Sequence, residues 1–191
     1  MKDIVPSFIS SNKLNNRTGI PSERKDFEMQ TLNSEALRDY LKWREFVFSV
    51  TGAQVEDAPE QPDHVYGVIM DIGLSNEFVI TVTAFATGES SLRTTVGGGA
   101  IGLGGDPFIA DHAKQIVTMA QSLLKTTKLI NNHNLPQGKQ AYFYFLTPAG
   151  LRLSESTMEE IYSRAHPFHE IFSRFTAIKA RSEELLKGSR T

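Results

Sequence analysis

A glycine-rich connection is the feature that most constrains how this chain can fold. Six of the ten residues from Val96 to Gly105 are glycine. Glycine loses more conformational freedom on folding than any other residue, so ordering this stretch is costly. We therefore expect the segment to pack closely against another part of the protein, a ligand or a partner.

The residues before this connection predict three antiparallel strands. Val65–Asp71 is apolar on both faces, which is typical of a central strand. Phe78–Phe85 alternates between apolar and polar residues, and Ser91–Val96 is a more polar strand. Turn residues at Asn76 and Gly88 make the connections short, which predicts a meander.

A helix and a hairpin are predicted after the connection. Asp106 can cap a helix with Pro107 at its first position, and the apolar period continues to about Lys125. Ala141–Thr147 is rich in aromatic residues and predicts a covered strand. Leu151–Ser154 follows a Pro-Ala-Gly turn and predicts the returning strand.

Further helices are predicted at the two ends of this region. Ser34–Ser49 has cap residues and one apolar face, although Trp43 and Phe46 lie off that face. Those two aromatics indicate either a helix buried on two sides or a contact with a partner. Ser156 and Glu159 have the spacing of a capping box, and the helices there break at Pro167, with the last helix running to about Lys187.

Together these elements predict the α+β class, with a single mainly antiparallel five-stranded sheet. The sheet consists of a three-strand meander, a helix and a hairpin, with helices packed on it. We expect a polar N-terminal arm at residues 1–31, one α+β domain at 32–187 and a tail at 188–191. The order of elements loosely resembles the layout of profilin-like and roadblock-like domains, with three strands before the middle helix and two after it.

Composition excludes several classes of function. The chain has no cysteine, which excludes disulfides, thiolate catalysis and cysteine-based metal sites. A formal net charge of -2 and the lack of a basic run speak against nucleic acid as a partner. No apolar run approaches the ~20 residues of a membrane helix, so we expect no membrane contact and a cytoplasmic location.

The glycine connection is the predicted binding site. The candidate ligand- or partner-binding residues are Arg93, Thr95, Gly97, Gly98, Gly99, Gly102 and Asp106. Gly97, Gly99 and Gly102 have the spacing of a dinucleotide-binding motif, but the preceding strands form a meander rather than a parallel βαβ unit. We therefore expect no cofactor here, and the loop either binds a ligand or partner or only forms a close backbone crossing.

Other polar residues give weaker signals. Asp71 and Arg93 could pair across the sheet. His166 and His169 are three residues apart, but Pro167 between them favours a capping or surface role over metal binding. His112 is interpreted as a residue at the edge of the core. No catalytic residue and no metal site is predicted.

These observations favour a non-catalytic binding or scaffold protein that acts through protein–protein contacts and associates as a homodimer. The alternative is a small-molecule sensor or enzyme with a pocket under the segment from Gly97 to Gly105, flanked by Arg93. A third hypothesis is that the glycine connection is an apolar edge on which a peptide docks.

Overall fold

The computed structural model describes residues 22–55 and 61–188, with side chains described from residue 34 onwards. The predicted arm at residues 1–31 and the predicted tail therefore lie largely outside the described residues. Helix α1 (Ser22–Ser49) begins well before the predicted start at Ser34. Its first residues are rich in Glu, Lys, Arg, Gln and Met, which favour a helix by propensity without forming an apolar period.

The centre of the fold is one antiparallel sheet of seven strands, so the predicted α+β class is confirmed. In spatial order the strands are β4 (Gly99–Ala100), β3 (Ser90–Thr94), β2 (Val79–Phe85), β1 (Gly67–Gly73), β6 (Gln140–Thr147), β7 (Gly150–Thr157) and β5 (Lys128–Ile130). The predicted count of five strands is too low, because β4 and β5 are short strands at the two edges. Two or three residues are too few to show an alternating pattern.

The two strand groups join at β1. This strand pairs with β2 on one side and with β6 on the other, and Asp71 lies opposite both Thr81 and Tyr142. All seven residues of β1 are buried. The predicted central position of this strand is therefore confirmed.

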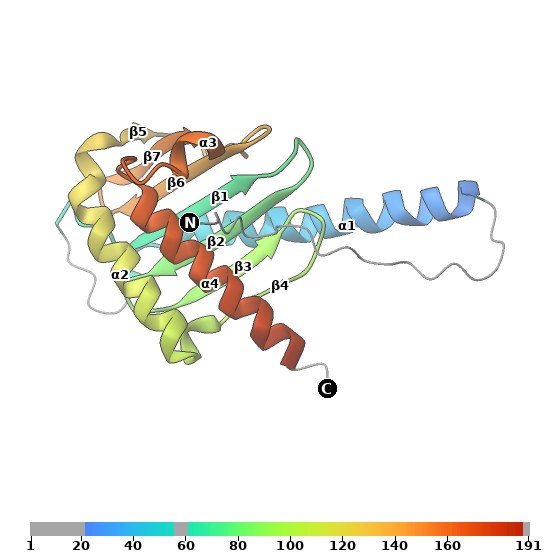
Figure 1. Ribbon diagram of the computed structural model, residues 1–191, viewed down its shortest axis with the longest axis horizontal. Coiled ribbons are helices and arrows are strands. Elements are labelled where there is room, and N and C mark those ends of the chain that lie inside the picture. Colours follow the sequence, from blue (N-terminus) through green and yellow to red (C-terminus); the bar gives the residue numbers. More distant parts are fainter. Residues whose placement is uncertain (1–21, 56–60, 189–191) are drawn as a thin grey trace, which may run out of the picture.

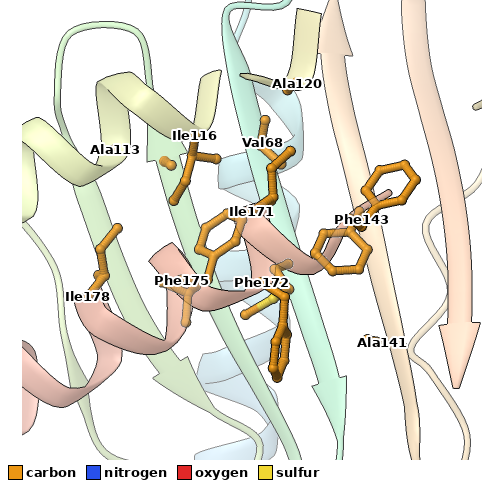
Figure 2. Packing of buried hydrophobic residues seen from close by; sticks show 14 of the residues in the cluster. Val68, Ala113, Ile116, Ala120, Ala141, Phe143, Ile171, Phe172, Phe175 and Ile178 are labelled. Carbon is orange, nitrogen blue, oxygen red and sulfur yellow. The ribbon is translucent and has the colours of Figure 1, made fainter. Parts of the chain in front are cut away.

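Two long helices cover one face of the sheet (Figure 1). Helix α2 (Pro107–Leu123) and helix α4 (His169–Gly188) pack against each other and against the strands. Figure 2 shows the resulting core, in which Ile116 of α2, Phe175 of α4 and Phe143 of β6 are fully buried. This layer contains the larger of the two apolar clusters.

Short helical segments complete the chain. They are η1 (Gly52–Gln54), η2 (Leu103–Gly105), η3 (Leu124–Thr126) and α3 (Met158–Ile161). The capping box of α3 is formed by Thr157 and Glu160, one residue later than predicted. The predicted helix break at Pro167 is confirmed, because α3 ends at Ile161 and α4 begins at His169.

Helix α1 lies on the opposite face of the sheet. Val47 packs there in a second, smaller apolar cluster with Ile69 of β1 and Tyr144 of β6. The N-terminal half of the helix runs beyond the strands (Figure 1). Within residues 22–55 and 61–188, no helix is both long and apolar enough to cross a membrane.

Candidate functional site

The glycine connection, Val96–Gly105, runs from β3 to α2 and touches α1. A Cβ added at Gly97 would lie 3.2 Å from the Cβ of Ala36 in α1. Gly99 has a φ of 116°, and a Cβ there would lie 2.0 Å from the carbonyl oxygen of Leu92 in β3. The expected close packing is confirmed at these two positions, where both packing partners belong to the same chain. It is not found at Gly98, Gly102 or Gly105, where an added Cβ would meet nothing within 4 Å.

This packing predicts unequal effects of alanine at two neighbouring glycines. We expect Gly99→Ala to lower the free energy of unfolding by about 3 kcal/mol, because the added methyl group meets backbone and the left-handed φ is strained. Gly98→Ala is the control, since its φ is 85° but an added Cβ meets nothing within 4 Å. That variant should lose only about 1 kcal/mol in the same chemical denaturation experiment. Equal losses would contradict the described pairing of β4 with β3.

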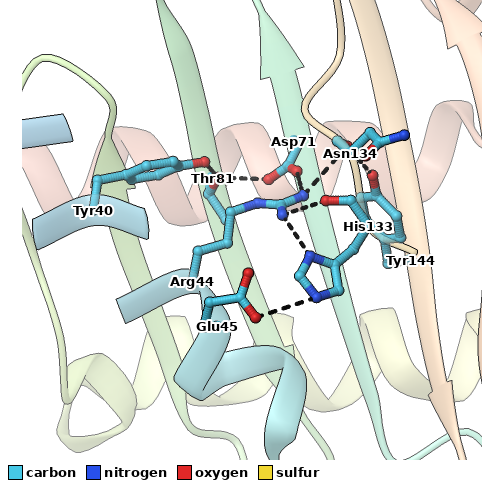
Figure 3. Close-up of polar contacts among 8 residues, drawn as sticks. All are labelled: Tyr40, Arg44, Glu45, Asp71, Thr81, His133, Asn134 and Tyr144. Carbon is cyan, nitrogen blue, oxygen red and sulfur yellow. Dashed lines mark hydrogen bonds and ion pairs between the residues drawn. The ribbon is translucent and has the colours of Figure 1, made fainter. Parts of the chain in front are cut away.

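A buried ion pair joins α1 to the centre of the sheet (Figure 3). Arg44 donates from Nη2 to Oδ2 of Asp71 at 2.5 Å, and the two side chains are 4% and 0% exposed. Thr81 donates to the other carboxylate oxygen at 2.5 Å, so the Tyr40 hydroxyl, 2.6 Å from the Thr81 oxygen, is the donor in that contact. The predicted cross-strand pair of Asp71 with Arg93 is therefore wrong, because the neutralising arginine comes from α1.

The segment between β5 and β6 closes over Arg44. The Nη1 atom of Arg44 lies 2.9 Å from Nδ1 of His133 and also donates to the backbone carbonyl oxygen of His133. An arginine nitrogen can only donate, so Nδ1 of His133 is the acceptor of this hydrogen bond. The ring hydrogen of His133 is therefore on Nε2, which lies 3.6 Å from a carboxylate oxygen of Glu45. The ring of Phe48 stacks on His133 with 4.2 Å between centroids and lies 4.5 Å from the Arg44 Cζ.

The electrostatics of this cluster favour a structural role. Burial, followed by the charge of Asp71, raises the pKa of Tyr40 well above its usual value. Burial by itself lowers the pKa of Arg44, but the charge and hydrogen bond of Asp71 outweigh it and raise that pKa overall. Both groups therefore keep their protons near neutral pH, whereas an acid–base catalyst needs a pKa close to the working pH. The cluster fixes α1 on the sheet.

A second arginine, Arg93, faces the same side of the sheet, and no carboxylate of the described residues forms an ion pair with it. Arg93 of β3 is half-buried, and its Cζ lies 5.9 Å from the ring centroid of Trp43. Among the described residues its Nε is buried without a hydrogen-bond partner, and so is the Oγ1 of Thr83 on the adjacent strand. The Nε of Arg44 is in the same state.

Two hollows border α1. The first groove, of about 470 Å³, is lined by Ser34, Leu37, Asn76, Glu77, Val79, Thr95, Val96 and Leu135. The second groove, of about 390 Å³, is lined by Trp43, Phe46, Val47, Val50, Gln54, Val55, Phe85, Thr87, Glu89, Ser91, Ile101 and Gly102. Both volumes are in the range of small-molecule sites, about 300–1,000 Å³.

Most of the predicted binding residues lie near α1. Thr95 lines the first groove, where its hydroxyl donates to the carbonyl oxygen of Glu77, and Gly102 lines the second groove. Arg93 lies opposite Gly99 in the sheet, and Gly97 and Gly98 form the turn between β3 and β4. The structure therefore brings these residues to one edge of the sheet, between the two grooves.

Asp106 is separated from the other predicted binding residues. It caps α2 by accepting from the backbone of Phe108 and Ile109, and it accepts from Arg181 of α4 at 2.8 Å. The hydrogen bond from Arg181 lowers the pKa of this carboxyl group. In this position the Asp106 side chain connects α2 and α4, on the face of the sheet opposite α1.

His112, His166 and His169 contact residues that are close to them in the sequence. His166 lies 2.9 Å from the Ser156 hydroxyl, and His169 lies 3.0 Å from the carbonyl oxygen of Ile161. His112 contacts the carbonyl oxygen of Phe108, one turn earlier in α2. Across the described ranges, no group of three or more His, Cys, Asp or Glu residues could hold a metal ion.

Comparison of the chain with family models, with curated proteins and with solved structures found no match. The function is therefore inferred from the geometry of the chain itself. The most distinctive feature of the described chain is the surface around α1.

Proposed function

We propose that this chain is a non-catalytic binding protein that acts through protein–protein contacts and associates with a second copy of itself. The observation that carries this proposal is the distribution of exposed large apolar side chains. Five of the nine among the described residues belong to α1 or to the glycine connection: Leu37, Leu41, Phe46, Val96 and Ile101. We call these five residues the α1–glycine surface, of which Leu37 and Val96 line the first groove and Phe46 and Ile101 line the second. Concentrated exposed apolar side chains mark contact sites.

Two members of this surface are suited to anchoring a partner. Phe46 is 64% exposed and Ile101 is 60% exposed, and both line the second groove. Aromatic residues next to an apolar hollow are enriched among the side chains that carry binding energy in interfaces. By contrast, the other exposed apolar residues are dispersed: Phe108 is in α2, Leu129 in β5, Leu185 in α4, and Tyr162 directly follows α3.

A second copy is the partner favoured by the shape of α1. The helix has 28 residues, and its N-terminal half extends past the strands (Figure 1). Isolated helical segments shorter than about 12–15 residues are marginally stable in water, so packing against a neighbour would stabilise this half. In a two-fold dimer one surface serves both subunits. The cytoplasmic location and the profilin-like or roadblock-like layout stay predictions.

The association is tested by multi-angle light scattering over a range of protein concentrations. We expect the mass to rise towards twice the 21.3 kDa of the chain. The double variant Phe46→Ser/Ile101→Ser should weaken association by at least about 30-fold, because it removes two central apolar anchors. Leu129→Ser/Tyr162→Ser is the matched control, since both residues are exposed and apolar but lie elsewhere.

The control variant should associate like the wild type. A wild-type mass of 21.3 kDa at every concentration would overturn the proposed self-association. Equal weakening by the two double variants would show that a different surface is used.

A further inference from the structure

The hydrogen bond between Arg44 and the His133 ring requires a neutral ring (Figure 3). The Nη1 atom of Arg44 lies 2.9 Å from Nδ1 of His133, and a guanidinium nitrogen can only donate. Nδ1 therefore accepts through its lone pair, which is the position that a second ring proton would occupy. Protonation of His133 would place two donors against each other in the position of this hydrogen bond.

This hydrogen bond joins α1 to the segment between β5 and β6. The ring of His133 also stacks on Phe48 of α1 with 4.2 Å between the centroids, and its backbone carbonyl oxygen accepts from Arg44. The next residue, Asn134, accepts from the Tyr144 hydroxyl, which connects the segment to β6. The protonation state of one ring nitrogen therefore affects how firmly α1 is held on the sheet.

The charges that face the His133 ring have opposite effects on its protonation. Arg44 opposes a second positive charge and its side chain is 4% exposed, although its ion pair with Asp71 weakens the repulsion. Glu45 favours a protonated ring from 3.6 Å, but its side chain is 69% exposed, and solvent screens an exposed charge more strongly. Tyr144 is uncharged, because burial and then the charge of Asp71 raise its pKa well above the usual value. Loss of the buried hydrogen bond therefore outweighs the attraction of Glu45.

We propose that His133 is a pH switch, in which protonation of its ring weakens the attachment of α1 to the sheet. A histidine that is free of tertiary contacts titrates at about pH 6.5. When α1 is released, the ring can bind a proton without losing a hydrogen bond, so the released form binds more protons than the attached form. By linkage, the attachment weakens as the pH falls through this range.

This regulation goes beyond the proposed self-association and can be measured without it. Within the α1–glycine surface, Leu37, Leu41 and Phe46 belong to α1, whereas Val96 and Ile101 belong to the glycine connection. Release of α1 would separate these two parts, so acid should also weaken association. That consequence alone rests on the proposed function, and a monomeric wild type would remove it without affecting the switch.

Urea unfolding at two pH values tests the switch. Trp43 is the single tryptophan of the chain and belongs to α1, so its fluorescence follows the attachment of this helix. Between pH 7.5 and pH 5.5 the equilibrium constant for attachment in dilute full-length protein should fall about tenfold. Carboxylates ordinarily stay ionised over this range. Light scattering at each pH follows association separately.

His133→Gln tests the assignment to this histidine. Glutamine offers Arg44 an acceptor oxygen but does not titrate, so the equilibrium constant should change less than about twofold between the two pH values. His112→Gln is the matched control, because Nδ1 of His112 contacts the carbonyl oxygen of Phe108, which accepts equally from a neutral or a protonated ring. The control should keep the wild-type pH dependence. Circular dichroism confirms that each variant is folded.

Three results would overturn the proposal. They are a wild-type attachment that does not weaken between pH 7.5 and pH 5.5, an unchanged pH dependence in folded His133→Gln, and a ring hydrogen on Nδ1 of His133 at pH 7.5. The last is read from the ring ¹⁵N chemical shifts of the wild type, which should show the hydrogen on Nε2. It therefore decides the matter even if the variant does not fold.

Discussion

Arg44→Met should lower the free energy of unfolding by about 3–5 kcal/mol, because it leaves the carboxylate of Asp71 buried without its charge partner. Methionine keeps most of the length and packing of the side chain, so the loss reports mainly on the charge. Arg38→Met is the control on the same helix, since Arg38 is exposed. Its effect should stay within about 0.5 kcal/mol.

In the Arg44→Met variant, α1 should also unfold from the sheet before the rest of the protein unfolds. Trp43 lies in α1, so its fluorescence follows the docking of this helix, whereas far-UV circular dichroism follows the whole chain. With the ion pair lost, the fluorescence transition should come at a lower denaturant concentration than the circular dichroism transition.

A double-mutant cycle then measures the interaction energy between Arg44 and Asp71. The variant Arg44→Met/Asp71→Leu should be destabilised by less than the sum of its two single variants, since it removes both buried charges together. Additive losses would show that the two side chains do not stabilise each other.

Phe175→Ala should lower the free energy of unfolding by a comparable amount, about 3–5 kcal/mol. Phe175 is fully buried between α4 and the sheet, so truncation removes apolar contacts and leaves a cavity (Figure 2). Phe46→Ala makes the same chemical change at a residue that is 64% exposed.

The Phe46→Ala control should change the stability of the dilute protein by no more than about 0.5 kcal/mol. Urea denaturation followed by circular dichroism measures both variants. Similar losses at the two positions would contradict the assignment of Phe175 to the core and Phe46 to the surface.

The apolar periods of the sequence predicted the layer formed by α2, α4 and the sheet. The stripe containing Ile116 and the stripe containing Phe175 are both buried as expected. The strand pattern also placed β1 at the centre. These elements were predictable because burial of a continuous apolar face determines where they lie.

The cluster around Arg44 was missed. Its signal was present as an arginine between Tyr40 and Val47 on an otherwise apolar helix face, and as Asp71 within an apolar strand. Nothing local relates these residues, because the ion pair spans 27 positions and the contact with His133 spans 89. Pairing across such separations depends on the tertiary fold.

The candidate site was predictable in part. The sequence indicated that the glycine connection is packed closely and that Arg93 is near it, and the structure places Arg93 opposite Gly99. The sequence did not indicate that α1 would be the packing partner or that Asp106 would bind Arg181. Those contacts depend on how helices on opposite faces cross the sheet.

Hydrogen exchange at low and high protein concentration tests most directly the claim that the α1–glycine surface joins two copies. We expect slower exchange at high protein concentration in residues 34–49 and 96–105, and no change in β5 or α4. Phe46→Ser/Ile101→Ser should abolish that difference. Protection confined to β5 or α4, or exchange that does not depend on protein concentration, would contradict self-association through this surface.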